Sequence, residues 1–143
     1  MKRVITLLAA VLMLLMLGGC GLGREPKDRI VDRVETHYDA IARACETRDI
    51  ETLSAMSGVE KVEVYDRFVV VFCEGHGIAT SSQDYGFYYS VDNVPAAISY
   101  NQSVLCEGDA LTADGDGYSC VVYGDTYYAE HIRGNLWFYS NAT

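Results

Sequence analysis

The first part of the domain places its hydrophobic side chains on one helical face. They recur at steps of three or four residues, with charged residues between them, at Ile30, Val34, Tyr38, Ile41 and Cys45. This spacing is typical of an amphipathic helix that packs against a core. Asp49 suits the N-cap of a second short helix over residues 50–57, with Gly58 as its C-terminal stop. Leu53 and Met56 are expected to face the core.

Beyond Gly58 the pattern changes to that of short strands. Residues 59–64 and 68–73 are rich in valine and predict a β-hairpin with a tight turn near Asp66. The glycines around His76 are expected to break the second of these strands. Residues 91–117 are predicted to be rich in loops. Further strands are predicted over residues 85–89, 118–123, 126–132 and 136–139. Hairpin turns at Gly124-Asp125 and Gly134-Asn135 are expected to join the last three.

This order of elements predicts an α+β fold, with one or two N-terminal helices packed on an antiparallel sheet of five or six strands. The order loosely resembles the cone-shaped nuclear-transport-factor-like fold, which hosts binding modules, isomerases and dehydratases. No motif accompanies that likeness, so it concerns element order alone. The run Tyr-Gly-Phe-Tyr-Tyr-Ser at residues 85–90 and the aromatic hairpins after it are similar to small uncharacterised lipoproteins of Gram-positive gut bacteria, a resemblance that implies no activity.

The first twenty residues have the features of an export signal. Lys2 and Arg3 precede an apolar run of 14 residues at positions 4–17, which is shorter than the roughly 20 residues that span a bilayer. The sequence Leu-Gly-Gly-Cys follows at residues 17–20. This segment resembles the lipobox of bacterial lipoproteins. An ordinary secretory signal with a chance cysteine is the alternative.

The lipobox resemblance implies that the Cys20 sulfur carries a diacylglycerol and that the lipoprotein signal peptidase cuts before Cys20. It divides the chain into a signal peptide (1–19), a lipidated tether (20–27) and a single α+β domain (28–143). Two or more acyl chains, such as palmitate, anchor a protein stably to a membrane. The expected location is the extracytoplasmic face of the cell membrane, or the outer membrane in a diderm host, because Gly21 rather than an aspartate follows the cysteine.

The domain is strongly acidic. Without Lys2 and Arg3, the mature part has nine basic and 20 acidic residues, which gives a formal net charge of −11. Such a surface repels nucleic acid phosphates, so nucleic acid is excluded as a partner. The lipid on Cys20 remains the expected link to the membrane.

Four cysteines lie in the domain, and an extracytoplasmic compartment permits disulfides. We expect a Cys106–Cys120 bridge, which closes an acidic loop, and a Cys45–Cys73 bridge, which ties helix to sheet. Each would add about 2–4 kcal/mol to the free energy of unfolding. Free buried thiols are the alternative. Because the spacings match no common zinc module and include no C-x-x-C, we predict neither a zinc site nor a redox motif.

No catalytic signature stands out along the chain. His76 lies between glycines, with Glu74 and Asp84 nearby, and is the best acid–base candidate. A polar turn is its plainer interpretation. The run Asp-Gly-Asp-Gly at residues 114–117 matches only part of a calcium loop. We therefore predict no catalytic residue, no metal and no cofactor.

Tyrosine is concentrated in the C-terminal part, where nine of the eleven tyrosines lie. Because side chains alternate along a strand, Trp137 and Tyr139 share one sheet face, opposite Leu136 and Phe138. We assign Leu136 and Phe138 to the core and expect Trp137 and Tyr139 to be exposed. The neighbours Tyr127 and Tyr128 point to opposite faces, and with Trp137 and Tyr139 they form the expected binding residues. Cross-strand pairs that only stabilise the sheet are the alternative.

The leading hypothesis is a membrane-anchored lipoprotein whose small, non-enzymatic domain binds an envelope protein or a glycan through its tyrosine-rich sheet. One alternative is an envelope hydrolase or isomerase that uses His76 and nearby acids. Another is a purely structural lipoprotein. A flat exposed aromatic face would favour binding, whereas a deep pocket lined by His76 would favour the enzyme.

Overall fold

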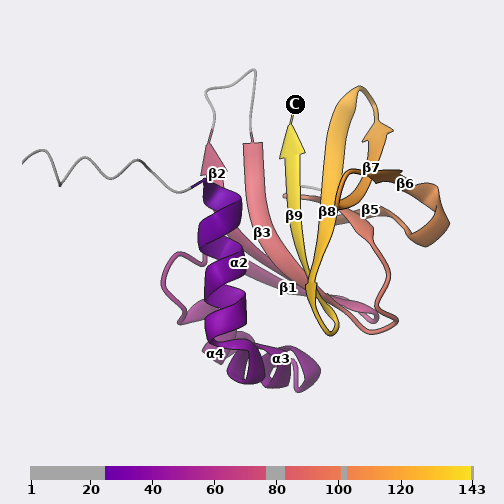
Figure 1. The fold of residues 1–143 in the computed structure, drawn as a ribbon. Coiled ribbons are helices and arrows are strands. Elements are labelled where there is room, and N and C mark those ends of the chain that lie inside the picture. The colour runs from indigo at the N-terminus through magenta and orange to yellow at the C-terminus, as the bar shows by residue number, and fades with distance from the viewer. Residues whose placement is uncertain (1–24, 77–82, 101–102, 143) are drawn as a thin grey trace, which may run out of the picture.

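A computed structural model describes residues 25–76, 83–100 and 103–142 of the chain. In these segments a helical N-terminal part precedes a strand-rich remainder (Figure 1). The helices are α2 (Pro26–Thr36), α3 (Tyr38–Glu46) and α4 (Ile50–Ser54). The strands are β1 (Lys61–Val64), β2 (Phe68–His76), β3 (Gln83–Ser90), β4 (Ala96–Ser99), β5 (Ser103–Glu107), β6 (Thr112–Asp114), β7 (Gly117–Val122), β8 (Asp125–Arg133) and β9 (Leu136–Ala142), with a 3-10 turn, η1 (Gly108–Ala110).

The predicted helical stripe is buried, but it runs over two helices. The backbone leaves the helical conformation at His37 (φ −114°, ψ 25°), where α2 ends and α3 begins, and α3 turns away from α2 (Figure 1). The turn keeps Ile41 and Cys45 in the core. The predicted N-cap is confirmed, because the Asp49 carboxylate accepts a hydrogen bond from the Thr52 amide at 3.0 Å.

The main sheet is antiparallel and has the strand order β1-β2-β3-β9-β8-β7-β6. The α+β class is confirmed, but this sheet holds seven strands instead of five or six. The additional strand is the short β6, which pairs with β7 across a tight turn at Gly115 (φ +58°). The expected break near His76 is also wrong, because β2 absorbs a register shift between Phe72 and Glu74 and continues.

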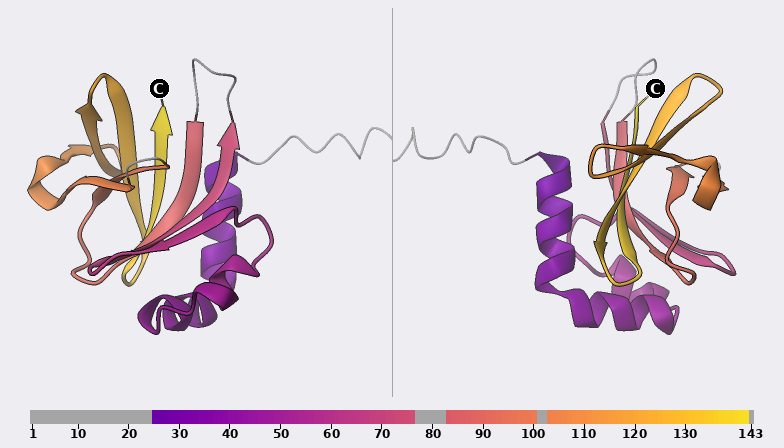
Figure 2. Two further views of the ribbon diagram at one scale, coloured as in Figure 1. Left: turned by 180° about the vertical axis from the view of Figure 1, so that it is seen from behind. Right: turned by 45° about the vertical axis from the view of Figure 1, so that its right-hand side comes forward.

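A second sheet, β4 with β5, covers the face of the main sheet that the helices leave free. Figure 2 shows α2 on one side of the main sheet and the segment with β5 on the other. Ala96, Ala97 and Ile98 are fully buried, and β4 lies against β8 and β9. The interpretation of residues 91–117 as loop is therefore only partly right, since this stretch supplies a whole layer.

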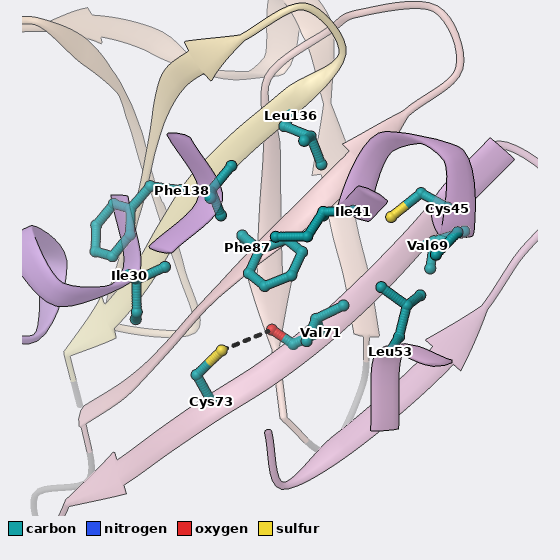
Figure 3. Packing of buried hydrophobic residues seen from close by; sticks show 12 residues of the cluster. Ile30, Ile41, Cys45, Leu53, Val69, Val71, Cys73, Phe87, Leu136 and Phe138 are labelled. Atoms are coloured by element: carbon teal, nitrogen blue, oxygen red, sulfur yellow. Dashed lines mark hydrogen bonds between the residues drawn. The ribbon is translucent and has the colours of Figure 1, made fainter. Parts of the chain in front are cut away.

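The molecule thus has two cores, one on each face of the main sheet. Figure 3 shows the first, which contains Ile41 of α3, Phe87 of β3 and Phe138 of β9. The second lies under β4 and contains Tyr88, Trp137 and Tyr139. The buried hydrophobic residues that the structure describes all lie between Ile30 and Tyr139. Residues 25–142 therefore include both of these cores.

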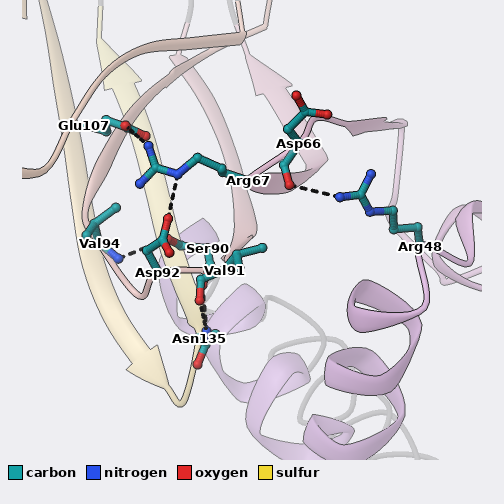
Figure 4. Close-up of polar contacts among 9 residues, drawn as sticks. All are labelled: Arg48, Asp66, Arg67, Ser90, Val91, Asp92, Val94, Glu107 and Asn135. Carbon is teal, nitrogen blue, oxygen red and sulfur yellow. Dashed lines mark hydrogen bonds and ion pairs between the residues drawn. The ribbon is translucent and has the colours of Figure 1, made fainter.

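Polar contacts fasten the loops at one end of the sheet (Figure 4). Arg67 donates to Asp92 at 2.6 Å and also to Glu107, and so ties the β1–β2 turn to β5. The Asn135 amide donates to the carbonyl oxygens of Ser90 and Val91 at 2.8 and 3.0 Å. The ion pairs of Arg67 are exposed and therefore screened by solvent, so these contacts mainly fix the path of the chain into β4.

Trp137 is expected to be structural. Its side chain is only 5% exposed, and its indole Nε1 donates to the Asn93 Oδ1 atom at 2.9 Å. Trp137→Ala should therefore lower the free energy of unfolding by about 3–5 kcal/mol, as should Phe138→Ala. Denaturant unfolding of residues 25–142 measures both changes. Tyr123→Ala is the control, because that side chain is 94% exposed. A Trp137→Ala cost as small as that of the control would contradict the burial.

Candidate functional site

The expected aromatic binding face is largely internal. Leu136 and Phe138 face the helices as predicted, but the expected exposure of Trp137 and Tyr139 is wrong. Alternation along β9 does place these two residues on the opposite face, where β4 and β5 cover them. Tyr127 is also buried, and of the expected binding residues only Tyr128 is half-exposed.

An exposed patch remains on the β7–β8 hairpin. It lies on the helix-facing side of the main sheet but beyond α2, which reaches β8 at Glu130 through the Lys27 ammonium (2.5 Å). Val121 is 69% exposed and Tyr123 94% exposed. We call this patch the β7–β8 surface. Its members are Ser119, Val121, Thr126 and Tyr128, which share one face by the register of the two strands, and Tyr123 in the turn between them.

Among the described residues, no strand pairs with the outer edge of β7 beyond Ser119. Pairing with β6 ends at Thr112 opposite Ser119. The β7–β8 turn contains two residues, Tyr123 (φ +53°) and Gly124 (φ +94°), which makes Val122 and Asp125 the closing pair. In an antiparallel ladder the backbone groups of alternate residues then point away from β8. The amide and carbonyl of Val121 therefore face outward.

Acidic residues lie near the β7–β8 surface, where Glu130, Asp116 and Asp114 act on Tyr128. Between Arg67 and Arg133 the chain contains nine of its 20 acidic residues and none of its 11 basic ones, so residues 68–132 carry a formal charge of −9, equal to that of the whole chain. The absence of Lys and Arg in this stretch is a sequence signal that could have pointed to this part of the sheet.

The hydroxyl of Tyr128 lies within this negative field. It donates to the Glu130 Oε2 atom at 2.5 Å. Burial, this hydrogen bond and the negative charges of Glu130, Asp116 and Asp114 all raise the pKa of Tyr128. Burial opposes ionisation of Glu130, but hydrogen bonds from Lys27 and Tyr128 leave its pKa below the usual value. Tyr128 therefore stays a neutral hydrogen-bonding group at physiological pH.

The structure brings Cys106 and Cys120 together as thiols. Cys106 of β5 and Cys120 of β7 have their Sγ atoms 3.1 Å apart. Burial, followed by the contact with Cys106, raises the pKa of Cys120 to about 12, so its thiol stays protonated at neutral pH. A protonated thiol is neither a ready nucleophile nor a metal ligand.

Cys45 of α3 and Cys73 of β2 lie in the same core, but Cys45 contacts a different part of β2. Cys45 packs beside Val69, whereas Cys73 lies beyond Val71 (Figure 3). Four residues along a strand span about 13 Å, more than a disulfide bridges. The expected Cys45–Cys73 bridge does not fit this arrangement. Burial and the nearby Glu46 raise the pKa of Cys45 to about 12, as expected of a buried thiol.

Two of the groups suggested for catalysis, Glu74 and His76, belong to β2, whose register places Gly75 opposite Asp84 of β3. The side chains of Glu74 and His76 lie outside the described residues. Asp84 accepts a hydrogen bond from the Asn141 amide at 3.2 Å, and His131 packs edge-on against Trp137. Within the described residues, no three His, Cys, Asp or Glu side chains form a group that could hold a metal ion.

A groove of about 310 Å³ opens where the three helices meet. Its floor consists of Ile41, Ala44 and Met56, and its rim carries Arg33, His37 and Thr52. The sequence pattern did not reveal this groove, because it depends on the change of direction at His37.

Comparisons of the chain with protein-family models, with curated proteins and with solved structures find no match. Along the described segments, no helix combines the length and apolar character needed to cross a membrane.

Proposed function

We propose that the protein is a lipoprotein, anchored by lipid on Cys20 at the extracytoplasmic face of a bacterial membrane, with a non-enzymatic domain that binds another polypeptide. The export signal and the Leu-Gly-Gly-Cys sequence at residues 17–20 support the anchor. Only five residues separate Cys20 from the first residue of α2, Pro26. Such a short tether would keep the domain close to the membrane.

The observation that carries the binding role is the exposed β7–β8 surface. Val121 and Tyr123 are the most exposed large hydrophobic residues in the described chain. No charged residue lies between Gly117 and Gly124, although charged side chains and prolines are the usual protection of an open sheet edge. An uncharged, open edge with exposed aromatic and branched residues favours recognition of an extended strand.

The partner that fits this surface is a cationic, extended segment of another protein. Its backbone would pair with Val121, in line with β6, and its apolar side chains would contact Val121 and Tyr123. Its Lys or Arg side chains would meet the acidic residues around the surface, among them Asp114 and Asp116. Charge complementarity of this kind governs the rate and specificity of association, and salt weakens it.

Val121→Lys tests this role. A short peptide of alternating lysine and valine should bind residues 25–142, and Val121→Lys should weaken binding by about tenfold or more, because a charge now stands at the open edge. Fluorescence anisotropy of the labelled peptide gives the affinity. Val91→Lys is the matched control, since Val91 is 53% exposed and lies outside the β7–β8 surface.

A peptide of alternating glutamate and valine should bind much more weakly, and binding of the lysine peptide should fall as salt rises. Equal affinities of Val121→Lys and Val91→Lys would contradict the β7 edge as the binding site. Absence of binding by either peptide would instead favour a purely structural lipoprotein.

Cys20→Ala tests the anchor in cells. A clickable fatty acid should label the parent protein and Cys120→Ala, but not Cys20→Ala, because only Cys20 lies in the lipobox. Detergent-phase partitioning of the three proteins gives an independent measurement, in which the Cys20→Ala variant should lose the behaviour of the mature lipoprotein. Undiminished labelling of Cys20→Ala would contradict lipid attachment at this residue.

An extracytoplasmic location also favours oxidation of Cys106 and Cys120. Forming the bridge removes two electrons and two protons from the thiols, and the disulfide of oxidised glutathione accepts them. The bridge should raise the free energy of unfolding by about 3 kcal/mol, the value for a loop of this length. Non-reducing peptide mapping after incubation with oxidised glutathione should find Cys106 joined to Cys120. A map in which Cys106 pairs only with Cys45 or Cys73 would contradict the arrangement.

A further inference from the structure

The groove at the helix corner exists because small residues line one side of α3. Ala40 and Ala44 are four residues apart and so lie on the same helix face. Together with Ile41 they border the groove opposite α4. The break at His37 turns this face toward the C-terminal end of α2. Alanines fill little of the space between the three helices, and about 310 Å³ remains, near the lower limit for sites of small ligands.

The groove has an apolar floor with a positive group at its rim. Ile41 and Ala44 are buried beneath it and Met56 is half-buried. The Arg33 guanidinium lies at the rim and packs so closely against Gly58 that a β-carbon there would approach it to 3.0 Å. Gly58 (φ +78°) therefore holds a backbone position that also leaves room for the Arg33 side chain.

The charge of this groove is opposite to that of the molecule. None of its lining residues is acidic, although the chain has 20 acidic residues. Among the described residues, no carboxylate forms an ion pair with Arg33. A half-exposed guanidinium beside an apolar floor is suited to a carboxylate, with which it forms charge-assisted, bidentate hydrogen bonds.

We propose that this groove binds a single-chain amphiphile with a carboxylate head, such as a free fatty acid. Arg33 would bind the carboxylate, and Ile41, Ala44 and Met56 would contact the alkyl chain and remove its methylene groups from water. Arg33 and His37 place the groove at the end of α2 opposite to its first residue, Pro26, where α3 and α4 lie (Figures 1 and 2). This position favours a ligand that arrives from the aqueous side over the lipid on Cys20.

Decanoate, used below its micelle concentration, is the probe. With residues 25–142, methyl NMR signals of Met56 and Ile41 should shift saturably, while those of Val121 should not. Arg33→Gln should raise the dissociation constant at least about tenfold, the lower end expected for losing a hydrogen bond between charged groups. Ala40→Phe, which fills the groove from an exposed position, should abolish the shifts. Arg43→Gln is the matched control, because Arg43 is exposed on α3 outside the groove.

Decyltrimethylammonium, which has the same chain and the opposite charge, should bind at least about tenfold more weakly, because it loses the charge-assisted bond to Arg33. Circular dichroism verifies that the variants remain folded. Equal binding of the two amphiphiles, or an Arg33→Gln variant that binds decanoate like Arg43→Gln, would overturn the carboxylate site. Absence of shifts at Met56 and Ile41 with folded protein would overturn the groove as a ligand site.

Discussion

The pairing of β3 with β9 is the interaction on which the other layers depend. It joins Gln83 to Ala142 at one end and Tyr89 to Leu136 at the other, across a long intervening stretch of chain. Alternate residues of the two strands supply both cores, with Phe87 and Phe138 toward the helices and Tyr88 and Trp137 toward β4. Close packing is extreme at Gly86, where a β-carbon would lie 2.1 Å from the Val71 carbonyl oxygen and 2.6 Å from the Tyr139 ring.

A sheet that is covered on both faces leaves little of its aromatic content for binding. The helices and the β4–β5 layer cover its middle strands, and the two most exposed large apolar side chains of the described residues, Val121 and Tyr123, lie beyond these layers. The β7–β8 surface lies beyond the reach of α2, and the groove lies where α2 gives way to α3. Both proposed sites thus result from the limited size of the covering layers, and they differ in the sign of their charge.

The sequence predicted the features that depend on local pattern. The buried stripe through Ile41, the N-cap at Asp49 and the alternation along residues 136–139 follow from short-range periodicity, and the structure has all three. The layer over Trp137 could not be predicted in this way, because Ala96–Ser99 is a short strand whose burial depends on distant partners. The exposure of Val121 depends likewise on how far α2 extends over the sheet. The groove depends on the helix break at His37, which no neighbouring glycine or proline predicts.

Amide hydrogen exchange on residues 25–142 tests most directly whether the β3–β9 pair is the centre of the fold and the β7 edge is open. The amides of Phe87 and Phe138 should exchange only through global unfolding, whereas the outward amide of Val121 should exchange orders of magnitude faster. Protection of Val121 equal to that of Phe87, or exchange of β3 and β9 through local opening before β7, would contradict the account.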